Sequence, residues 1–154
     1  MDDFYDFSDL KPGMRVNVEG DYAAADGSIR AHQISIKDDS EDDEIEATIQ
    51  SVDPAAGTIR LLGLTVRTPA DLEIKDVDKS PLSAKALEPG MRVKTKGRLL
   101  ADGSFAPLKI KLKMPTPDAM DEIEGTITAV DASNNTFHLM GFRVVCDADV
   151  EIEA

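Results

Sequence analysis

The sequence predicts an all-β protein made of two small five-stranded barrels, and three observations carry that prediction. Strand-forming residues recur in short alternating runs. The turn-forming pairs Pro-Gly and Asp-Gly separate these runs. Two blocks of the chain are also written twice: residues 43–74 return at 121–152 without a gap, and residues 10–20 return at 87–97. The repeats therefore indicate the organisation of the chain before any single residue is considered.

The composition indicates a soluble folded chain with an aliphatic core. Of its 154 residues 42% are hydrophobic and only 5% aromatic, so Ile, Val and Leu must supply most of the buried area. The net charge of −13 repels nucleic acid and anionic membranes, which makes nucleic acid an unfavoured partner. No apolar run approaches the roughly 18 residues of a membrane span, and the first residues lack the features of a signal peptide. The single cysteine, Cys146, excludes an intrachain disulfide.

Residues 1–9 form an acidic tail that carries an aromatic cluster, Phe4, Tyr5 and Phe7. Such a cluster is expected to dock, because exposed rings in an otherwise aromatic-poor chain are unfavourable in water. Two docking sites are open at this stage. The tail could cover the end of a barrel in its own chain, or it could serve as an interaction segment that adds to a neighbouring molecule.

Two hairpins are predicted, over residues 10–37 and 87–113. In each, a Pro-Gly pair fits a type II turn, a strand follows, and an Asp-Gly pair fits the tight turn before the returning strand. The Pro-Gly pairs are at 12–13 and 89–90, and the Asp-Gly pairs are at 26–27 and 102–103. Residues 108–113 alternate strictly between apolar and lysine residues, so each hairpin is expected to bury one face.

Two further units, residues 43–68 and 121–146, each predict three strands. Their first strands alternate apolar with acidic or polar residues. Gly63 and Gly141 stand at the same place in the two copies and allow a bend or bulge before the third strand. A connector over residues 70–87 follows the first unit, and its proline at position 81 could open a short helix.

Three strands, a connector and a hairpin give residues 43–113 the strand order of a complete OB-like barrel. The hairpin at 10–37 and the unit at 121–152 are then two halves, and neither can bury its apolar face alone. We expect them to form a second, circularly permuted OB-like barrel. The predicted domains are therefore the tail 1–9, a continuous barrel over 43–114, and a second barrel from 10–37 together with 121–152. The alternative pairs 10–37 of one chain with 121–152 of another, which gives a swapped dimer or a filament.

These motifs resemble an uncharacterised bacterial family of OB-like repeat domains, a domain of unknown function often found in exported proteins. The resemblance rests on an opening strand of the form Gly-x-Ile at 125–127, the glycine between the second and third strands, and Pro-Gly-x-x-Val-x-Val-x-Gly at 12–20. Ala47 replaces the opening glycine in the other copy, and Thr95 replaces the second valine. The resemblance implies the barrel fold and an exported, periplasmic or extracellular location. It implies no activity.

One hairpin carries a basic face in this acidic chain. The alternation predicts that one side presents six cations: Lys94, Lys96, Arg98, Lys109, Lys111 and Lys113. This face could bind an anionic polymer, as OB-like barrels often do. Alternatively, Glu44 and Glu46 on the neighbouring strand lie beside Lys94 and Lys96 and form cross-strand ion pairs with them. Two observations favour the ion pairs: the hairpin has no aromatic platform, and the equivalent face of the first hairpin, with Asn17, Glu19, Gln33 and Ser35, is not basic.

The expected function is a non-catalytic structural or protein-interaction module. The sequence contains no phosphate-binding loop, metalloprotease helix or nucleophile elbow, so no catalytic residue, metal ligand or cofactor is predicted. A protein partner is expected, or self-association through exchange of 10–37 and 121–152. The alternative function is a ligand-binding domain for an oligosaccharide, an anionic polymer or a metal ion.

Overall fold

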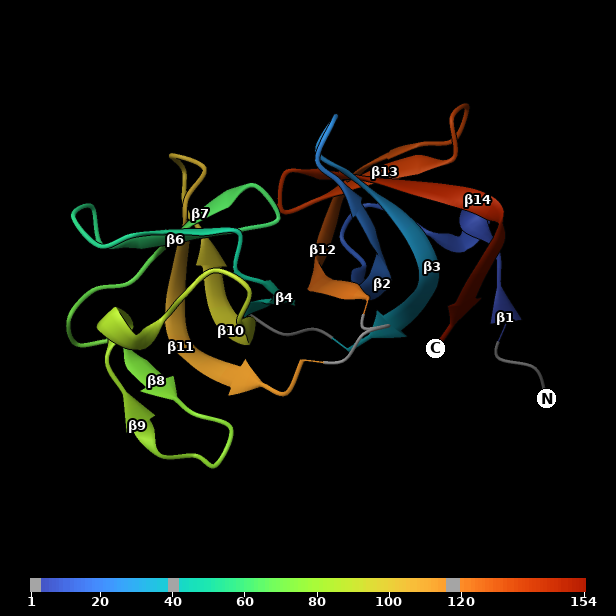
Figure 1. Ribbon diagram of the computed structural model, residues 1–154. Helices are drawn as coiled ribbons and strands as arrows, with labels where there is room; N and C mark the ends of the chain where they lie inside the picture. Colours follow the sequence, from blue (N-terminus) through green and yellow to red (C-terminus); the bar gives the residue numbers. More distant parts are fainter. Residues whose placement is uncertain (1–3, 39–41, 116–119) are drawn as a thin grey trace. The chain divides into compact units, whose positions relative to one another are not determined.

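A computed structural model describes residues 4–38, 42–115 and 120–154, and within these ranges the chain is all-β (Figure 1). The only helical elements in the described ranges are two short 3-10 turns. The chain divides into two compact units. The first contains residues 1–43 and 120–154, and the second contains residues 44–119. The predicted fold class, all-β with a barrel, is confirmed.

The first unit is a closed barrel of five strands. Strand β12 pairs with β2, β2 with β3, β3 with β14, β14 with β13, and β13 again with β12. All of these pairs are antiparallel except β3–β14, which is parallel. Strands from both ends of one chain therefore close this barrel. Its strands are β2 (Arg15–Ala23), β3 (Ser28–Lys37), β12 (Asp121–Asp131), β13 (Thr136–Leu139) and β14 (Phe142–Glu153).

The interior of this barrel is filled by alternate residues of its strands, as expected from the period of two. Val16 and Val18 of β2, Ile34 of β3 and Val144 of β14 are fully buried, and Phe137 of β13 is the largest fully buried side chain of the unit. The hairpin at 10–37 and the three-strand unit at 121–152 therefore share one core, as expected from two segments that cannot bury their apolar faces separately.

The second unit contains the strands β4 to β11. Strands β10 and β11 form an antiparallel hairpin, and β4 lies beside β10. Strands β5, β6 and β7 form an antiparallel meander, while β7 and β8 both run parallel to β11. These strands are β4 (Asp43–Thr48), β5 (Ser51–Asp53), β6 (Thr58–Leu61), β7 (Leu64–Arg67), β8 (Glu73–Lys75), β9 (Pro81–Leu82), β10 (Arg92–Leu99) and β11 (Phe105–Lys113).

The N-terminal segment docks on its own barrel. Strand β1 (Phe4–Tyr5) pairs antiparallel with the end of β14, and a 3-10 turn, η1 (Phe7–Asp9), follows it. The second unit has the same arrangement: β9 pairs with β8, and η2 (Ala84–Ala86) follows. In each unit the next residue, Leu10 or Leu87, is buried. Residues 4–10 therefore occupy the place in the first unit that residues 81–87 occupy in the second.

Two local predictions are corrected by these elements. Proline 81 opens no helix, because it lies in β9 and only the single 3-10 turn η2 follows it. The glycines at 63 and 141 form tight two-residue hairpin turns rather than bends or bulges. Leu62 and Gly63 both have positive φ angles, 50° and 78°, and so do Met140 and Gly141. Positive φ at both central residues is the signature of a type I′ turn, which matches the twist of the flanking strands.

The two Asp-Gly hairpin turns continue into serines that hold the aspartates in place. The Asp102 carboxylate accepts hydrogen bonds from the hydroxyl and the backbone N–H of Ser104, at 2.6 and 3.0 Å. Asp26 accepts the same pair from Ser28. These hydrogen bonds favour the ionised carboxylate and lower the pKa of both aspartates below the ordinary value of 3.8.

Replacing Ser104 by alanine is expected to raise the pKa of Asp102 toward 3.8, because its largest stabilising contact is lost. A lowered pKa stabilises the folded chain at pH values above 3.8, and that contribution disappears as the pH falls through the folded-state pKa. The destabilisation by Ser104→Ala should therefore be present at neutral pH and shrink in acid. NMR titration of the carboxyl carbons measures the pKa directly. The pKa of Asp26 should stay lowered in the variant. A change in the pKa of both aspartates would show that the hydrogen bonds from Ser104 are not what lowers the pKa of Asp102.

Candidate functional site

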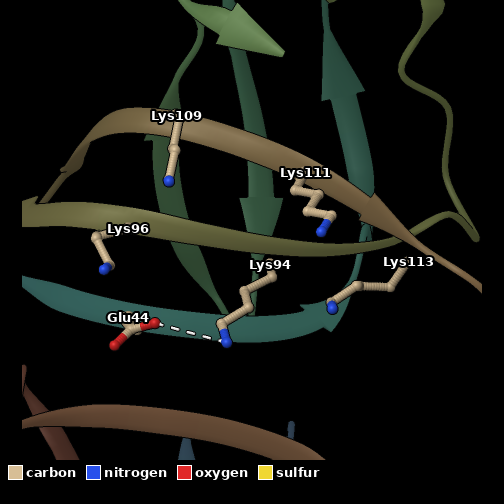
Figure 2. Close-up of a pocket in the computed structure, with 6 residues that line it drawn as sticks. All are labelled: Glu44, Lys94, Lys96, Lys109, Lys111 and Lys113. Carbon is tan, nitrogen blue, oxygen red and sulfur yellow. Dashed lines mark ion pairs between the residues drawn. The ribbon is translucent and has the colours of Figure 1, made fainter. Parts of the chain in front are cut away.

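The candidate site is a cluster of five lysines on one face of the β10–β11 hairpin, here called the lysine face (Figure 2). The alternation of each strand turns these side chains away from the core. The register places Lys94 opposite Lys111 and Lys96 opposite Lys109. Like charges directly opposite each other on a sheet repel, so this arrangement destabilises the hairpin. The lysine face consists of Lys94, Lys96, Lys109, Lys111 and Lys113.

A shallow hollow of about 220 Å³ lies within the lysine face, and Glu44 of β4 is its sixth lining residue. The Glu44 carboxylate lies 3.7 Å from the ammonium nitrogen of Lys94, and Figure 2 shows this ion pair beside the other lysines. Among the residues that the structure describes, no carboxylate lies within ion-pair distance of the other four lysines. One carboxylate therefore faces five ammonium groups.

The predicted pairing of the two glutamates on β4 differs from what is found. Glu44 does pair with Lys94, but Glu46 lies 3.5 Å from the guanidinium of Arg92 rather than beside Lys96. Arg92 is buried, at 6% exposure, and therefore attracts the carboxylate more strongly than an exposed lysine would. Arg15 holds the equivalent place in the first unit, where it pairs with Glu124 at 3.4 Å. The Met-Arg-Val repeat at 14–16 and 91–93 was the available signal for both arginines.

Arg98, the sixth predicted cation, does not line the hollow. The register of β10 and β11 shifts between Lys96 and Gly97, and beyond this bulge Arg98 is opposite Ala106. The extra residue at this bulge is Leu108 of β11, so Arg98 keeps the alternation of Lys94 and Lys96 along β10 but has no lysine opposite it.

The first unit provides an internal comparison for the lysine face. Its hairpin has the same register, with Asn17 opposite Ser35 and Glu19 opposite Gln33, and its own bulge follows at Gly20. These residues stand where the second unit has its two lysine pairs. The same backbone therefore forms without any lysine at these four positions, and the fold itself does not require the cluster.

The aromatic residues of the tail are placed on the first unit. Phe4 and Tyr5 pair with the end of β14, and Tyr5 and Phe7 line a hollow of about 270 Å³ together with Cys146 and Ile152. Burial raises the pKa of Cys146 to about 12, with a smaller contribution from the charge of Asp147. The thiol is protonated at neutral pH and is a poor nucleophile.

The described residues contain no group of three His, Cys, Asp or Glu side chains placed to hold a metal ion. No helix in the described ranges is long and apolar enough to cross a membrane.

The sequence was also compared with known proteins. A search of the curated proteins found no match, and neither did a search of the solved structures. A family described as "Domain of unknown function (DUF5666)" matches residues 1–35 and 46–111. The first matched region includes the N-terminal segment that forms β1 and η1, and the second extends from β4 to β11. Because these regions cover well over half of the sequence, the chain belongs to the DUF5666 family.

Proposed function

We propose that the chain is a non-catalytic binding module built of two OB-like barrels. One barrel is continuous over residues 43–113, and the other is circularly permuted from residues 10–37 plus 121–152, with residues 4–9 completing it. The parallel pairing of β3 with β14 and of β11 with β7 and β8 supports this assignment, because it places the third and fifth strands of each barrel side by side. The duplicated turns also support the assignment, because the Pro-Gly pairs at 12–13 and 89–90 and the Asp-Gly pairs at 26–27 and 102–103 occupy equivalent positions in the two barrels.

The lysine face is the ligand-binding surface of this module, and its ligand is an anion. The observation that carries this proposal is the direct opposition of Lys94 with Lys111 and of Lys96 with Lys109. The chain has a net charge of −13 and thirty acidic residues, yet among the residues that the structure describes only Glu44 contributes a carboxylate to the hollow. An arrangement that is unfavourable without a ligand, and absent from the equivalent hairpin, is typical of a functional site.

The test is a charge reversal that should affect stability and binding in opposite directions. Lys109→Glu places a carboxylate opposite Lys96 and should raise the free energy of unfolding by roughly 0.5 kcal/mol, because repulsion becomes attraction. The same change should abolish the increase in melting temperature that multivalent anions cause in the wild type. Sulfate, citrate, inorganic triphosphate and a sulfated polysaccharide would be compared at constant ionic strength. If no anion stabilises the wild type, the proposal is wrong.

A second candidate function is assembly with other copies of the chain. It is favoured by one observation: the first unit closes with strands from the two ends of the chain. A neighbouring copy could supply the same hairpin in exchange. Sedimentation over a wide range of protein concentration tests this, since a monomer at every concentration excludes exchange as the function.

A further inference from the structure

The lysine face differs from the surfaces that OB-like barrels use for single-stranded nucleic acid. Such surfaces stack successive bases on aromatic rings and follow the backbone with positive charge. The only ring within residues 44–119 is Phe105, and its side chain is fully buried. Neither a base nor a sugar ring therefore has an aromatic surface on which to stack. Recognition at this face depends on charge and on hydrogen bonds from ammonium groups.

The length of the ligand is limited by the charge of the rest of the chain. An extended polyanion would run beyond the lysine face onto a protein whose net charge is −13. Repulsion over that length opposes binding, because charges act over roughly 8 Å at physiological ionic strength. A compact anion held within the hollow of about 220 Å³ is not exposed to this repulsion. The site therefore favours charge concentrated in a short molecule.

The ligand also needs several negative charges and many acceptor oxygens. Each lysine ammonium offers three donors that rotate freely, and ammonium groups bind phosphate as compact point charges. Five such groups converge from two strands, so a single carboxylate or monovalent anion would leave most of them without a partner. A chain of two or three phosphates carries enough oxygens and charge to contact several lysines at once.

From these three constraints we infer that the ligand of the lysine face is a compact oligophosphate, either free or as the phosphate chain of a nucleotide. The inference rests on the proposed anion-binding function and names its ligand class. The phosphates lie between Lys94 and Lys96 on one strand and Lys109 and Lys111 on the other, with Lys113 at the end of the hollow. Glu44 is an internal counter-ion, and the ligand competes with it for Lys94.

Isothermal titration of the full chain with inorganic triphosphate, without divalent metal, tests the inference. The wild type should bind triphosphate more tightly than monophosphate, and adenosine and guanosine triphosphates should bind about as tightly as triphosphate itself. Lys111→Glu should weaken binding by at least about tenfold. Glu44→Gln should tighten it by about fivefold, because the competing carboxylate is lost. Lys85→Glu makes the same charge change on an exposed site of the same unit and should alter the affinity by less than about twofold.

The outcomes separate the ligand class from the function. Binding of a sulfated polysaccharide without binding of triphosphate would overturn the inference and leave the proposed anion-binding function standing. Absence of binding to either would overturn both. An equal loss of affinity in Lys85→Glu and Lys111→Glu would show that net charge, rather than the hollow, controls binding, and would also overturn the inference. Lys111→Gln, which removes the charge without reversing it, guards against a folding defect, and its melting temperature is measured alongside.

Discussion

Replacing Gly97 by alanine is expected to destabilise the second unit by at least about 3 kcal/mol, at the upper end of the effects of overpacking. A Cβ atom at Gly97 would lie 2.2 Å from the carbonyl oxygen of Ala106 and 2.6 Å from the Cα atom of Pro107. Both are backbone atoms of the partner strand, so no side-chain rotation can relieve the contact. Gly97 follows directly after the register shift at Lys96, where β11 has the extra residue Leu108.

The equivalent glycine of the first unit should behave in the same way. A Cβ atom at Gly20 would lie 2.1 Å from the carbonyl oxygen of Arg30, again beside a register shift. The substitution Gly20→Ala should therefore destabilise the first unit about as strongly as Gly97→Ala destabilises the second. Amide hydrogen exchange resolves the two effects, because each variant should lose protection mainly within its own unit.

Gly13 and Gly90 provide the matched controls. Both have a φ angle of +93°, but no atom lies within 4 Å of a Cβ atom built at either position. Alanine at these turns costs only the strain of the left-handed conformation, roughly 1 kcal/mol. If Gly97→Ala were no more destabilising than Gly90→Ala, the close approach of the strands would not be the reason for the glycine.

The repeats made most of the strands predictable, because turn residues and alternation are local properties of the sequence. The gapless correspondence of 43–74 with 121–152 predicted the same strands in both units. The hairpin glycines at 20 and 97 belong to the same repeats, although their packing against the opposite strand depends on the register. Local pattern therefore indicated which residues form strands but not how closely those strands approach.

The role of residues 4–9 was not predictable in the same way. Residues 4–9 and residues 81–86 are identical at no aligned position, so the sequence repeat begins only at Leu10. The two segments are nevertheless equivalent, since each forms a two-residue strand and a 3-10 turn. Main-chain hydrogen bonds define both segments, and such bonds place little demand on side-chain identity.

At the candidate site, alternation identified which lysines share a face but could not assign their partners. The sequence predicted ion pairs of Glu44 and Glu46 with Lys94 and Lys96. In the structure Glu44 pairs with Lys94, whereas Glu46 pairs with Arg92. The pairing of Glu46 depends on the burial of Arg92, which is a tertiary property. The bulge in β11, which leaves Arg98 opposite Ala106 instead of a lysine, is also invisible to a pattern of period two.

Removing residues 1–38 is expected to unfold the first unit completely and leave the second folded. The deletion takes away β1, β2 and β3, so β12 and β14 lose the neighbours that close their barrel. The three strands that remain cannot bury their apolar face. In an amide NMR spectrum, the resonances of residues 121–153 should move to the chemical shifts of an unfolded chain, while the resonances of residues 44–113 should stay dispersed.

Moving the deleted segment to the other end of the chain should restore the fold. In this variant the chain starts at residue 42, and residues 4–38 follow Ala154 through a short polar linker. The second unit joins β8 to β9 with residues 76–80, so a linker of that length spans the same distance between β14 and β1. In the relocated chain each of the two units is continuous in sequence, and the strand pairs are expected to be those of the native chain. Short loops change stability little, so the melting temperature should stay close to that of the wild type.

The relocated variant also distinguishes closure within one chain from exchange between chains. In the relocated chain each hairpin directly follows its own three-strand unit in the sequence. A hairpin from another molecule then has less chance to take its place than in the native chain, where residues 10–37 and 121–152 are far apart in the sequence. A wild-type dimer that became a monomer on relocation would indicate that the native chain exchanges hairpins. A monomer in both cases, with dispersed resonances for residues 121–153, would support closure within one chain. Unfolded resonances for 121–153 in the relocated chain would contradict the permuted barrel, because only the order of its segments was changed.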